Sequence, residues 1–279
     1  MVVGLFHLHR QKMFLACKPR IPGKRFASVW ETLSYRQPQD KSKSLPILKS
    51  TNPAGEICKL QESTSNHQGR TIAIGDIHGC AKELQTLLEL IKPATEDTII
   101  FLGDYIDRGP DSKTVIETVI ALRRCCNVVT LVGNHEVMLL DAIEQPLMLS
   151  LWLQFGGQQT LDSYGGDLSA IPDRHLEFID NCLLFHETND HLFVHANYLP
   201  TIPLDQQDPQ ILLWTHLTEL QPKPHVSGKR VFVGHTPQKN GRILDYGHLI
   251  CLDTFCFGNG ILTAMDIHSN DIWQTDGQI

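Results

Sequence analysis

Five apolar runs of this chain are each followed by side chains that can bind a metal ion or transfer a proton. In chain order, these side chains are Asp76, His78, Asp104, Asp107, Arg108, Asn134, His135, His195 and His235. Ligands of open α/β sheets collect beyond the carboxyl ends of the strands. If each apolar run is a strand, the five sets of side chains converge on one cleft.

The residue types in this set indicate a metal site with nitrogen and oxygen ligands. Asp, Asn and His without Cys suit Mn²⁺, Fe or Zn²⁺. One carboxylate can bridge two ions. Two ions about 3.5–4 Å apart can stabilise both the attacking and the leaving oxygen of a phosphoryl transfer. They can also activate water near neutral pH. An arginine beside them, here Arg108, can bind phosphate oxygens through two parallel hydrogen bonds.

Each motif also has a purely structural interpretation. The stretch "GDIHG" can be a tight turn, His195 can be a buried structural histidine, and Asp107 can cap a loop. A series of unrelated turns does not explain why all these motifs follow strand-like runs in order. We therefore expect one functional site.

The pattern after residue 70 predicts alternating strands and helices. Strand-like runs occupy residues 71–75, 98–103 and 128–133, and helical apolar spacing follows each of them. In the first helix the apolar positions are Leu84, Leu87, Leu88 and Ile91. We expect Ser112 to cap the second helix. Strand, helix, strand, helix, strand predicts parallel β-α-β units with right-handed crossovers.

The chain divides into a basic leader and an acidic body. Residues 1–70 contain 12 Lys and Arg against 4 Asp and Glu, a net charge of +8. We expect residues 1–69 to be disordered and residues 70–279 to form one domain. Within it, residues 145–190 are predicted to be a mostly helical insertion over one end of the sheet. The β-rich remainder predicts an α/β fold with two sheets face to face and helices outside.

The composition argues against several classes of protein. No apolar run approaches the ~20 residues that span a bilayer. Residues 71–279 hold 12 Lys and Arg against 27 Asp and Glu, a net charge of −15, which disfavours nucleic-acid binding and favours a protein that attracts cations. The eight cysteines include no CxxC pair, so we interpret them as reduced thiols of a cytoplasmic protein. We expect neither nucleic acid nor a membrane among the partners.

Three of the motifs together resemble the signature of a known family. GDIHG (75–79), GDYIDRG (103–109) and GNHE (133–136) are similar to the motifs of the phosphoprotein phosphatases, which are calcineurin-like metallophosphoesterases. The stretches at 152–165 and 251–267 resemble the bacterial and phage-like branch of serine/threonine protein phosphatases and symmetrical dinucleoside tetraphosphatases. The resemblance implies a two-sheet β-sandwich flanked by helices, in α-β-β-α layers.

The resemblance also implies a role for each residue of the set. Two divalent metal ions are implied, with Mn²⁺ as the first choice and Fe or Zn²⁺ as alternatives, and they activate the attacking water. Their implied ligands are Asp76, His78, Asp104, Asn134, His195 and His235, with Asp104 bridging the two ions. His135 would protonate the leaving oxygen, Asp107 would orient His135, and Arg108 would bind the phosphoryl oxygens. Glu136 would support the site from outside the ligand set.

Two stretches depart from the family pattern. Where the family supplies a second phosphate-binding arginine, this chain has "LLWTHL", with His216. His216 could be a weaker, pH-dependent contact to the substrate phosphate, or it could only pack or face solvent. The stretch "HANY" leads us to expect Asn197 and Tyr198 to line the cleft near His195.

These observations support three hypotheses about function. The first is a metal-dependent phosphomonoesterase that dephosphorylates phosphoserine and phosphothreonine in protein substrates. The alternative is a symmetrical dinucleoside tetraphosphate hydrolase, which would use the same core. The acidic body favours the protein substrate, because a dinucleotide needs more cationic groups. A minor alternative is a non-catalytic binding module on a phosphatase fold. The motifs do not specify an oligomeric state.

Overall fold

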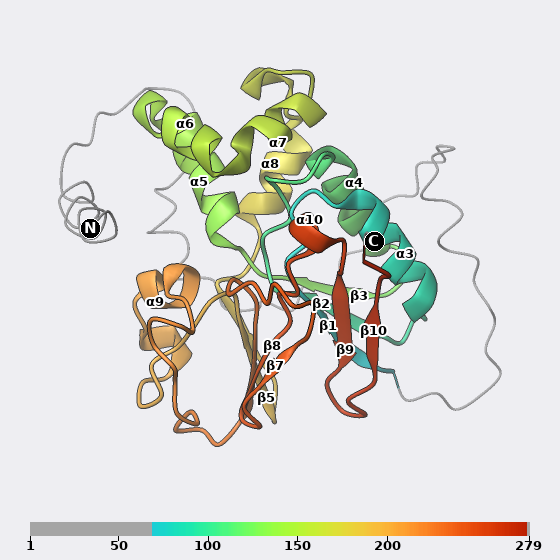
Figure 1. Cartoon of the computed structure of the whole chain (residues 1–279), viewed down its shortest axis with the longest axis vertical. Coiled ribbons are helices and arrows are strands. Elements are labelled where there is room, and N and C mark those ends of the chain that lie inside the picture. Colours follow the sequence, from blue (N-terminus) through green and yellow to red (C-terminus); the bar gives the residue numbers. More distant parts are fainter. Residues whose placement is uncertain (1–68, 278–279) are drawn as a thin grey trace.

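Two five-stranded sheets form the centre of the computed structural model, which describes residues 69–277 (Figure 1). The first sheet has the order β10-β9-β1-β2-β3. Its strands are β1 (Thr71–Ile74), β2 (Thr98–Phe101), β3 (Asn127–Thr130), β9 (Thr263–Asp266) and β10 (Ile272–Gln274). β1, β2 and β3 are parallel, as predicted, and β9 is antiparallel to both β1 and β10. The expected leader lies outside the described residues except for Gly69.

The second sheet has the order β4-β5-β6-β8-β7. Its strands are β4 (Phe185–Glu187), β5 (His191–Val194), β6 (Arg230–Val233), β7 (Leu244–Asp245) and β8 (Leu249–Cys251). β5, β6 and β8 are parallel to one another, whereas β4 and β7 are antiparallel edge strands. In both sheets the parallel strands therefore end on a common edge, where the predicted site residues follow them.

Alternating side chains explain why the two sheets form a sandwich. Ala73 and Ile100 of the first sheet belong to the same buried cluster as Phe193 and Phe232 of the second sheet, and the two phenylalanine rings stack at 5.5 Å between centroids. Successive strand residues point to opposite faces, so neighbours such as Ile72 face the helices instead. The predicted fold class, two sheets face to face with helices outside, is confirmed.

Two helices connect the parallel strands of the first sheet. These are α3 (Ala81–Ile91) and α4 (Ser112–Leu122), and the four predicted apolar residues of the first helix are all buried. The prediction that Ser112 caps the second helix is wrong. The cap is Asp111, whose side chain accepts a hydrogen bond from the Thr114 amide at 3.0 Å. The Ser112 hydroxyl instead accepts a hydrogen bond from the Asp107 amide at 3.1 Å.

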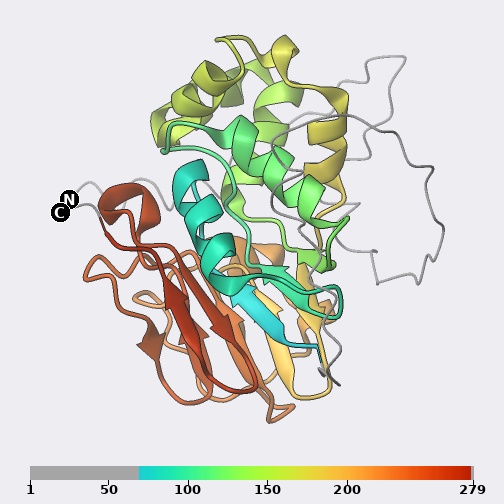
Figure 2. The ribbon, with the colours of Figure 1, turned by 90° about the vertical axis from the view of Figure 1, so that its right-hand side faces the viewer.

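A group of helices lies beyond one end of the sheets, at the top of Figures 1 and 2. It consists of α5 (Asn134–Glu144), α6 (Pro146–Trp152), the π-helical turn η2 (Leu153–Gly157), α7 (Gln158–Ser163), the 3₁₀ turn η3 (Leu168–Ala170) and α8 (Asp173–Asp180). The helical stretch ends at Asp180, and β4 follows inside the range that was expected to be mostly helical. We refer to α6 through α8 as the helical cap.

Three short elements complete the described residues. They are the 3₁₀ turn η4 (Leu204–Gln206), α9 (Pro209–Trp214) and α10 (Cys256–Asn259). In Figure 1, α9 lies beside the second sheet, and α10 lies near the helical cap. No helix among residues 69–277 is both long enough and apolar enough to cross a membrane.

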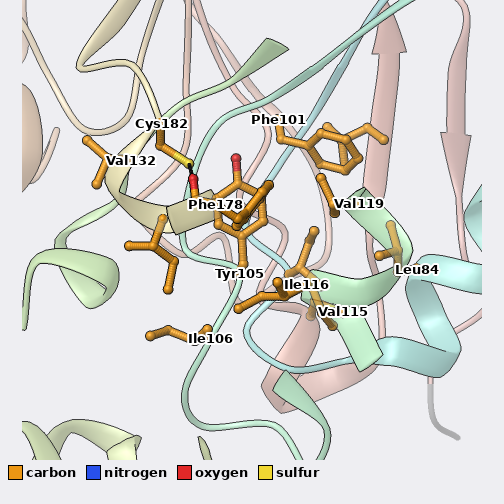
Figure 3. Close-up of a cluster of buried hydrophobic side chains, with 14 of the residues drawn as sticks. Leu84, Phe101, Tyr105, Ile106, Val115, Ile116, Val119, Val132, Phe178 and Cys182 are labelled. Carbon is orange, nitrogen blue, oxygen red and sulfur yellow. Dashed lines mark hydrogen bonds between the residues drawn. The ribbon is translucent and has the colours of Figure 1, made fainter. Parts of the chain in front are cut away.

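The loop after β2 is anchored by a buried tyrosine. Tyr105 directly follows Asp104 and is fully buried. Its ring packs edge-on against Phe178 of α8 at 5.3 Å and lies beside Ile116 of α4 (Figure 3). Its hydroxyl donates a hydrogen bond to the Leu131 carbonyl at 2.9 Å. Because this anchor restrains the backbone, the charged residues on both sides of it have fixed positions.

The cysteines of the described residues are mostly free. Five of them are buried free thiols, namely Cys80, Cys126, Cys182, Cys251 and Cys256. These five agree with the expectation of reduced thiols.

A buried ion pair secures the start of the first sheet. The Asp97 carboxylate, which is fully buried, binds the Arg70 guanidinium at 2.5 Å and accepts hydrogen bonds from the Arg70 amide at 2.8 Å and the Ala94 amide at 2.9 Å. Burial alone raises the pKa of Asp97, but these hydrogen bonds outweigh burial and lower it below the ordinary value of 3.8. The folded state is therefore stabilised by the ionised carboxylate.

We expect Asp97→Asn to reduce the free energy of unfolding by about 3 kcal/mol at pH 7, since it leaves Arg70 partly buried without its counter-charge. Urea titrations followed by circular dichroism measure this. The lowered pKa means that the contribution is complete above the unfolded pKa of 3.8 and is lost as the pH falls through the lower folded value. The control is Asp245→Asn, which removes the exposed pair with Arg230 and should change the free energy by less than about 1 kcal/mol. Equal effects of both substitutions would contradict the prediction.

Candidate metal centre

The strand ends bring the predicted ligands together around Asp104. Its carboxylate forms one group of potential ligands with His78 and His135, and a second group with His195 and His235. Within each group all ligand atoms lie within 4.8 Å of one another. Asp104 is the member common to both groups, which is the position that a bridging carboxylate would need.

The two oxygens of Asp104 face different histidines. Oδ2 lies 3.4 Å from His78 Nε2, and Oδ1 lies 3.5 Å from His195 Nε2. The amide oxygen of Asn134 lies 3.0 Å from the same His195 nitrogen. Burial by itself raises the pKa of Asp104, but the surrounding imidazoles hold it well below the usual range. Asp104 is therefore ionised and can attract a cation from either side.

Backbone groups orient the histidine rings. Nδ1 of His78 lies 2.9 Å from the Ile106 carbonyl, and Nδ1 of His195 lies 2.8 Å from the Leu102 carbonyl. A carbonyl oxygen only accepts, so each Nδ1 carries the proton and each Nε2 turns a lone pair toward Asp104. Burial lowers the pKa of His78, His195 and His235, which keeps the rings neutral, the form that binds metals.

Unpaired buried atoms test whether a metal ion suits this arrangement. Among the described residues, Asp76 Oδ1, His135 Nε2 and His235 Nε2 are buried and have no hydrogen-bond partner. The other oxygen of Asp76 accepts a hydrogen bond from the His235 amide at 2.8 Å. An unpaired buried polar atom is costly, and a cation bound by oxygen and nitrogen would satisfy Asp76 Oδ1 and His235 Nε2. The residues present therefore fit divalent metal ions.

A second buried carboxylate, Asp253, lies beside Asp76 and was not predicted. Burial, Asp253 and Asp104 together raise the pKa of Asp76 well above its ordinary value, and burial and Asp104 raise the pKa of Asp253 to about 7. A cation nearby would relieve the repulsion between the two carboxylates. The signal was in the sequence, because Asp253 follows the last residue of β8 by two positions, as Asp76 follows β1.

The backbone at the site is conformationally unusual. Five residues of the predicted set have a positive φ, namely His78, Asp104, Asp107, Arg108 and His235. Such conformations are disfavoured for residues with side chains and persist where the surroundings impose them. Close approach also requires glycine: a Cβ on Gly133 would lie 2.1 Å from Asp104 Oδ1, and one on Gly234 would lie 1.9 Å from Asp76 Oδ1.

Glu136 holds the loop that carries Asp104. Its carboxylate accepts hydrogen bonds from the amides of Gly133 at 2.8 Å, Asp104 at 2.9 Å and Tyr105 at 2.8 Å. Glu136 is fully buried and is not a member of either ligand group. Its contacts join the loop after β2 to the start of α5. The Asp104 carboxylate and the His135 ring are therefore held in fixed positions relative to each other.

His135 and Asp107 form a tightly held pair. His135 Nδ1 lies 2.7 Å from Asp107 Oδ2. The same carboxylate accepts a hydrogen bond from Trp152 Nε1 at 2.8 Å and one from the Thr160 hydroxyl at 2.7 Å. Trp152 and Thr160 belong to the helical cap and were not predicted. Trp152 binds Oδ2, the oxygen that also contacts His135, and Thr160 binds Oδ1, so the two hydrogen bonds fix the orientation of the carboxylate.

Arg108 and His216 border the ligand groups. Arg108 Nη1 lies 2.8 Å from His78 Nε2, and its guanidinium lies over the Phe257 ring at 4.7 Å. The Arg108 amide donates a hydrogen bond to the Gly156 carbonyl of the helical cap at 3.1 Å. The His216 ring stacks on His235 at 4.3 Å between centroids. Both predicted substrate contacts therefore lie beside potential metal ligands.

The described residues correspond to a known family of enzymes. The family model of calcineurin-like phosphoesterases matches residues 69–264, which include every residue of both ligand groups. The chain belongs to this family. The match confirms the family expected from the motifs and makes this phosphoesterase a metal-binding hydrolase.

Relatives of this phosphoesterase are named for different substrates. The chain is 32% identical to serine/threonine-protein phosphatase 1 of Salmonella typhimurium, over 70% of this chain and 90% of that protein. It is 34% identical to the symmetrical bis(5'-nucleosyl)-tetraphosphatase of Nitrosomonas europaea, over 49% of this chain and 47% of that protein. The match thus spans about half the length of the tetraphosphatase.

A solved structure has a similar fold. The model matches the structure of a cold-active protein tyrosine phosphatase with a TM-score of 0.55 and 18% identity, over 86% of this chain and 87% of that one. At this level of identity the likeness concerns the fold alone.

One expectation about the cleft of this phosphoesterase is wrong. Asn197 and Tyr198 are fully buried and line no cleft. Asn197 Nδ2 donates a hydrogen bond to the Leu220 carbonyl at 2.8 Å, and the Tyr198 hydroxyl donates one to the Lys223 carbonyl at 2.9 Å. Both side chains secure the loop after α9 instead of facing a substrate.

We expect Asp104→Asn to weaken metal binding by this phosphoesterase more than about 100-fold, since even partners outside the ligand set are worth about 10–100-fold. Hydrolysis of p-nitrophenyl phosphate should be almost completely lost. Calorimetric titration with Mn²⁺ and a colorimetric assay measure the two effects.

The matched control for Asp104→Asn is Asp111→Asn, in the same loop. Asn caps a helix about as well as Asp, so α4, metal binding and hydrolysis should be unchanged. Unaltered Mn²⁺ binding by Asp104→Asn would show that this carboxylate does not hold the ions.

Proposed function

We propose that this chain is a metal-dependent phosphomonoesterase that removes phosphate from phosphoserine and phosphothreonine in protein substrates. One observation carries the proposal: His135, with its ring fixed by Asp107 and its Nε2 unpaired, belongs to the same close group of side chains as His78 and Asp104. This places a candidate proton donor beside a candidate metal centre. The minor alternative, a non-catalytic module, has no such use for the pair.

The proposed ligands are those that the sequence predicted. Two divalent ions, with Mn²⁺ as our first choice and Fe or Zn²⁺ as alternatives, would be held by Asp76, His78, Asp104, Asn134, His195 and His235. Bound there, the ions supply a nucleophile from water near neutral pH and neutralise charge on phosphoryl oxygens. Oxygen and neutral imidazole donors without thiolates support this assignment.

The chain's own residues complete the proposed chemistry. Arg108 binds two phosphoryl oxygens through its planar guanidinium and offsets charge that develops on them. His135 donates the proton on Nε2 to the leaving alkoxide of serine or threonine. Asp107 holds the His135 ring in position through the contact at 2.7 Å. Trp152 and Thr160 keep the Asp107 carboxylate in place.

His216 is proposed as a further contact to the substrate phosphate. It stands where the family pattern has a second arginine, and its stacking on His235 supports a position at the edge of the centre. An imidazole carries a positive charge only when protonated, so this contact is weaker than one from arginine and depends on pH.

Two observations favour a protein substrate. The serine/threonine phosphatase relative is matched over 90% of its length, whereas the tetraphosphatase relative is matched over 47%. Cationic groups on the second sheet are also engaged elsewhere: Arg230 pairs with Asp245, and Lys229 pairs with Glu187. A phosphorylated side chain needs fewer cationic partners than a chain of four phosphates. A cytoplasmic location stays a prediction.

A specific observation also favours the second candidate, a dinucleoside tetraphosphate. Next to Arg108, the Phe257 ring contacts the Phe255 ring at 4.6 Å, and Lys239 Nζ lies 5.6 Å from the centre of the Phe255 ring. Aromatic faces can stack on a base, and a lysine can neutralise additional phosphates. The substrate comparison below therefore includes this candidate.

The substrate class is tested by turnover with Mn²⁺ on two substrates at equal concentration. We expect a phosphothreonine peptide to be hydrolysed faster than diadenosine tetraphosphate, because Arg108 and the metal centre suffice for one phosphate. Release of inorganic phosphate and chromatography of nucleotides measure the rates. The control is Lys239→Ala, which should leave the peptide rate unchanged. Faster hydrolysis of the dinucleotide, with a rise in its KM in Lys239→Ala, would establish the second candidate instead.

The proposed acid is tested through the leaving group. Trp152→Phe removes one hydrogen bond that fixes Asp107, and Thr160→Val removes another. We expect each to lower kcat at least about 10-fold for a phosphothreonine peptide, whose leaving alkoxide needs a proton. For p-nitrophenyl phosphate, whose leaving group is weakly basic, kcat should change much less. For each substrate, the KM of either variant should be similar to that of the wild type.

The control for the leaving-group test is Trp273→Phe, on β10 and away from Asp107, which should affect neither substrate. An equal loss of kcat on both substrates in the cap variants would show that Trp152 and Thr160 only support the fold. Unchanged rates on both substrates would show that the hydrogen bonds to Asp107 are dispensable.

A further inference from the structure

Three side chains outside the proposed active site form another cluster of potential metal ligands. They are Cys80, Glu83 and Cys256, and their two sulfurs and one carboxylate oxygen lie within 4.8 Å of one another. Both cysteines are buried free thiols, and Glu83 is half-buried. Neither the ligands of the proposed centre nor the proposed acid belongs to this cluster.

We propose that Cys80, Glu83 and Cys256 form a separate binding site for one thiophilic divalent cation, with Zn²⁺ as the chemically favoured ion. Two thiolates and a carboxylate are common ligands of Zn²⁺, which takes a fourth ligand such as water in a tetrahedral arrangement. Thiolates also select softer ions than the oxygen and nitrogen donors around Asp104 do. The two sites would therefore differ in their preferred metals.

The backbone already places the three side chains for this purpose. Cys80 and Glu83 are three positions apart at the start of α3 and so lie on the same face of the helix. The Cys80 amide donates to the Ile77 carbonyl at 3.2 Å, and the Cys80 carbonyl accepts from the Leu84 amide at 3.0 Å. The Cys80 side chain makes no capping hydrogen bond with α3, which leaves its sulfur directed toward the cluster.

The hydrogen bond of the Cys80 sulfur is weak. Cys80 Sγ donates to the His78 carbonyl at 3.5 Å. A thiol is a poor donor, so replacing this contact with a coordination bond to a cation loses little. With the Glu83 carboxylate beside them, the two buried sulfurs would bind a metal ion more strongly than they interact with each other.

A cation at this site would join two segments that are far apart in the sequence. Cys80 is the N-cap residue of α3 and lies two residues after His78. Cys256 is the first residue of α10. The next residue, Phe257, packs edge-on against His78 at 5.1 Å and lies under the Arg108 guanidinium at 4.7 Å. The bound ion would thus hold Phe257, the ring beneath the Arg108 guanidinium, in place without itself taking part in hydrolysis.

A disulfide is the competing interpretation of two neighbouring thiols. Forming one removes a hydrogen from each sulfur and requires an external two-electron oxidant, and it gives the Glu83 carboxylate no role. The presence of the carboxylate within the same 4.8 Å therefore favours the cation.

The test uses Co²⁺ as a spectroscopic probe of the full-length protein, reduced and kept free of oxygen. Cobalt bound to thiolate has a sulfur-to-metal charge-transfer absorption in the near ultraviolet, which oxygen and nitrogen ligands do not produce. We expect wild-type protein to show this absorption with one equivalent of Co²⁺ beyond those bound by the Asp104 centre, and Zn²⁺ to abolish it by displacement. Zn²⁺ should also raise the Tm.

Matched variants identify the ligands. Cys256→Ser should lose the charge-transfer absorption, and Glu83→Gln should keep it with weaker Co²⁺ affinity. Cys182→Ser, which removes another buried free thiol whose sulfur donates to the Phe178 carbonyl, should behave as wild type. Glu83→Gln, on a half-buried side chain, serves as the test if Cys256→Ser does not fold.

Three results would overturn the proposal. The first is the absence of thiolate absorption in wild-type protein with excess Co²⁺. The second is an absorption that Cys256→Ser leaves unchanged, together with a Co²⁺ affinity that Glu83→Gln leaves unchanged. The third is a protein mass that is two hydrogens lower without reductant, with both cysteines in one crosslinked peptide, which would identify a disulfide. None of these results depends on which phosphoester is the substrate.

Discussion

The carboxylate of Asp104 is the charge on which the candidate centre depends. It is the only residue common to both groups of potential ligands among the described residues, and each of its oxygens faces a different histidine. A buried carboxylate is stable only where cations or donors surround it. Here the His135 amide donates a hydrogen bond to Asp104 Oδ1 at 3.1 Å. The Glu136 contacts and the buried Tyr105 anchor hold the positive-φ backbone of the loop after β2 in place.

The centre is divided between two parts of the fold. The potential ligands follow strands of the two sheets, whereas the groups that fix Asp107 come from the helical cap. Gly156 of the cap also binds the Arg108 backbone. Asp104, Asp107 and Arg108 share one short loop, in which the sheet positions Asp104 and the cap positions Asp107 and Arg108. In the proposed mechanism, a change in the cap therefore alters proton transfer without touching a ligand.

Local pattern explains which parts of the fold and site were predictable. The parallel strands, the apolar face of α3 and the convergence of the strand-end residues all followed from periodicity and from the position of polar residues after apolar runs. Asp253 obeys the same rule but lacks the preceding glycine that marks Asp76, Asp104, Asn134 and His235. Asn197 and Tyr198 were misjudged because their burial depends on the loop after α9, which no local pattern reveals.

The sequence by itself determined the order of strands and helices, the types of ligand and the family, because these depend on neighbours along the chain. Only the tertiary structure decided which side chains meet. Trp152 and Thr160 reach Asp107 because the helical cap folds over the sheet edge, and Cys80 meets Cys256 because α10 returns to the start of α3. Such pairs are set by long-range packing, and a single sequence carries no periodic signal for contacts between distant segments.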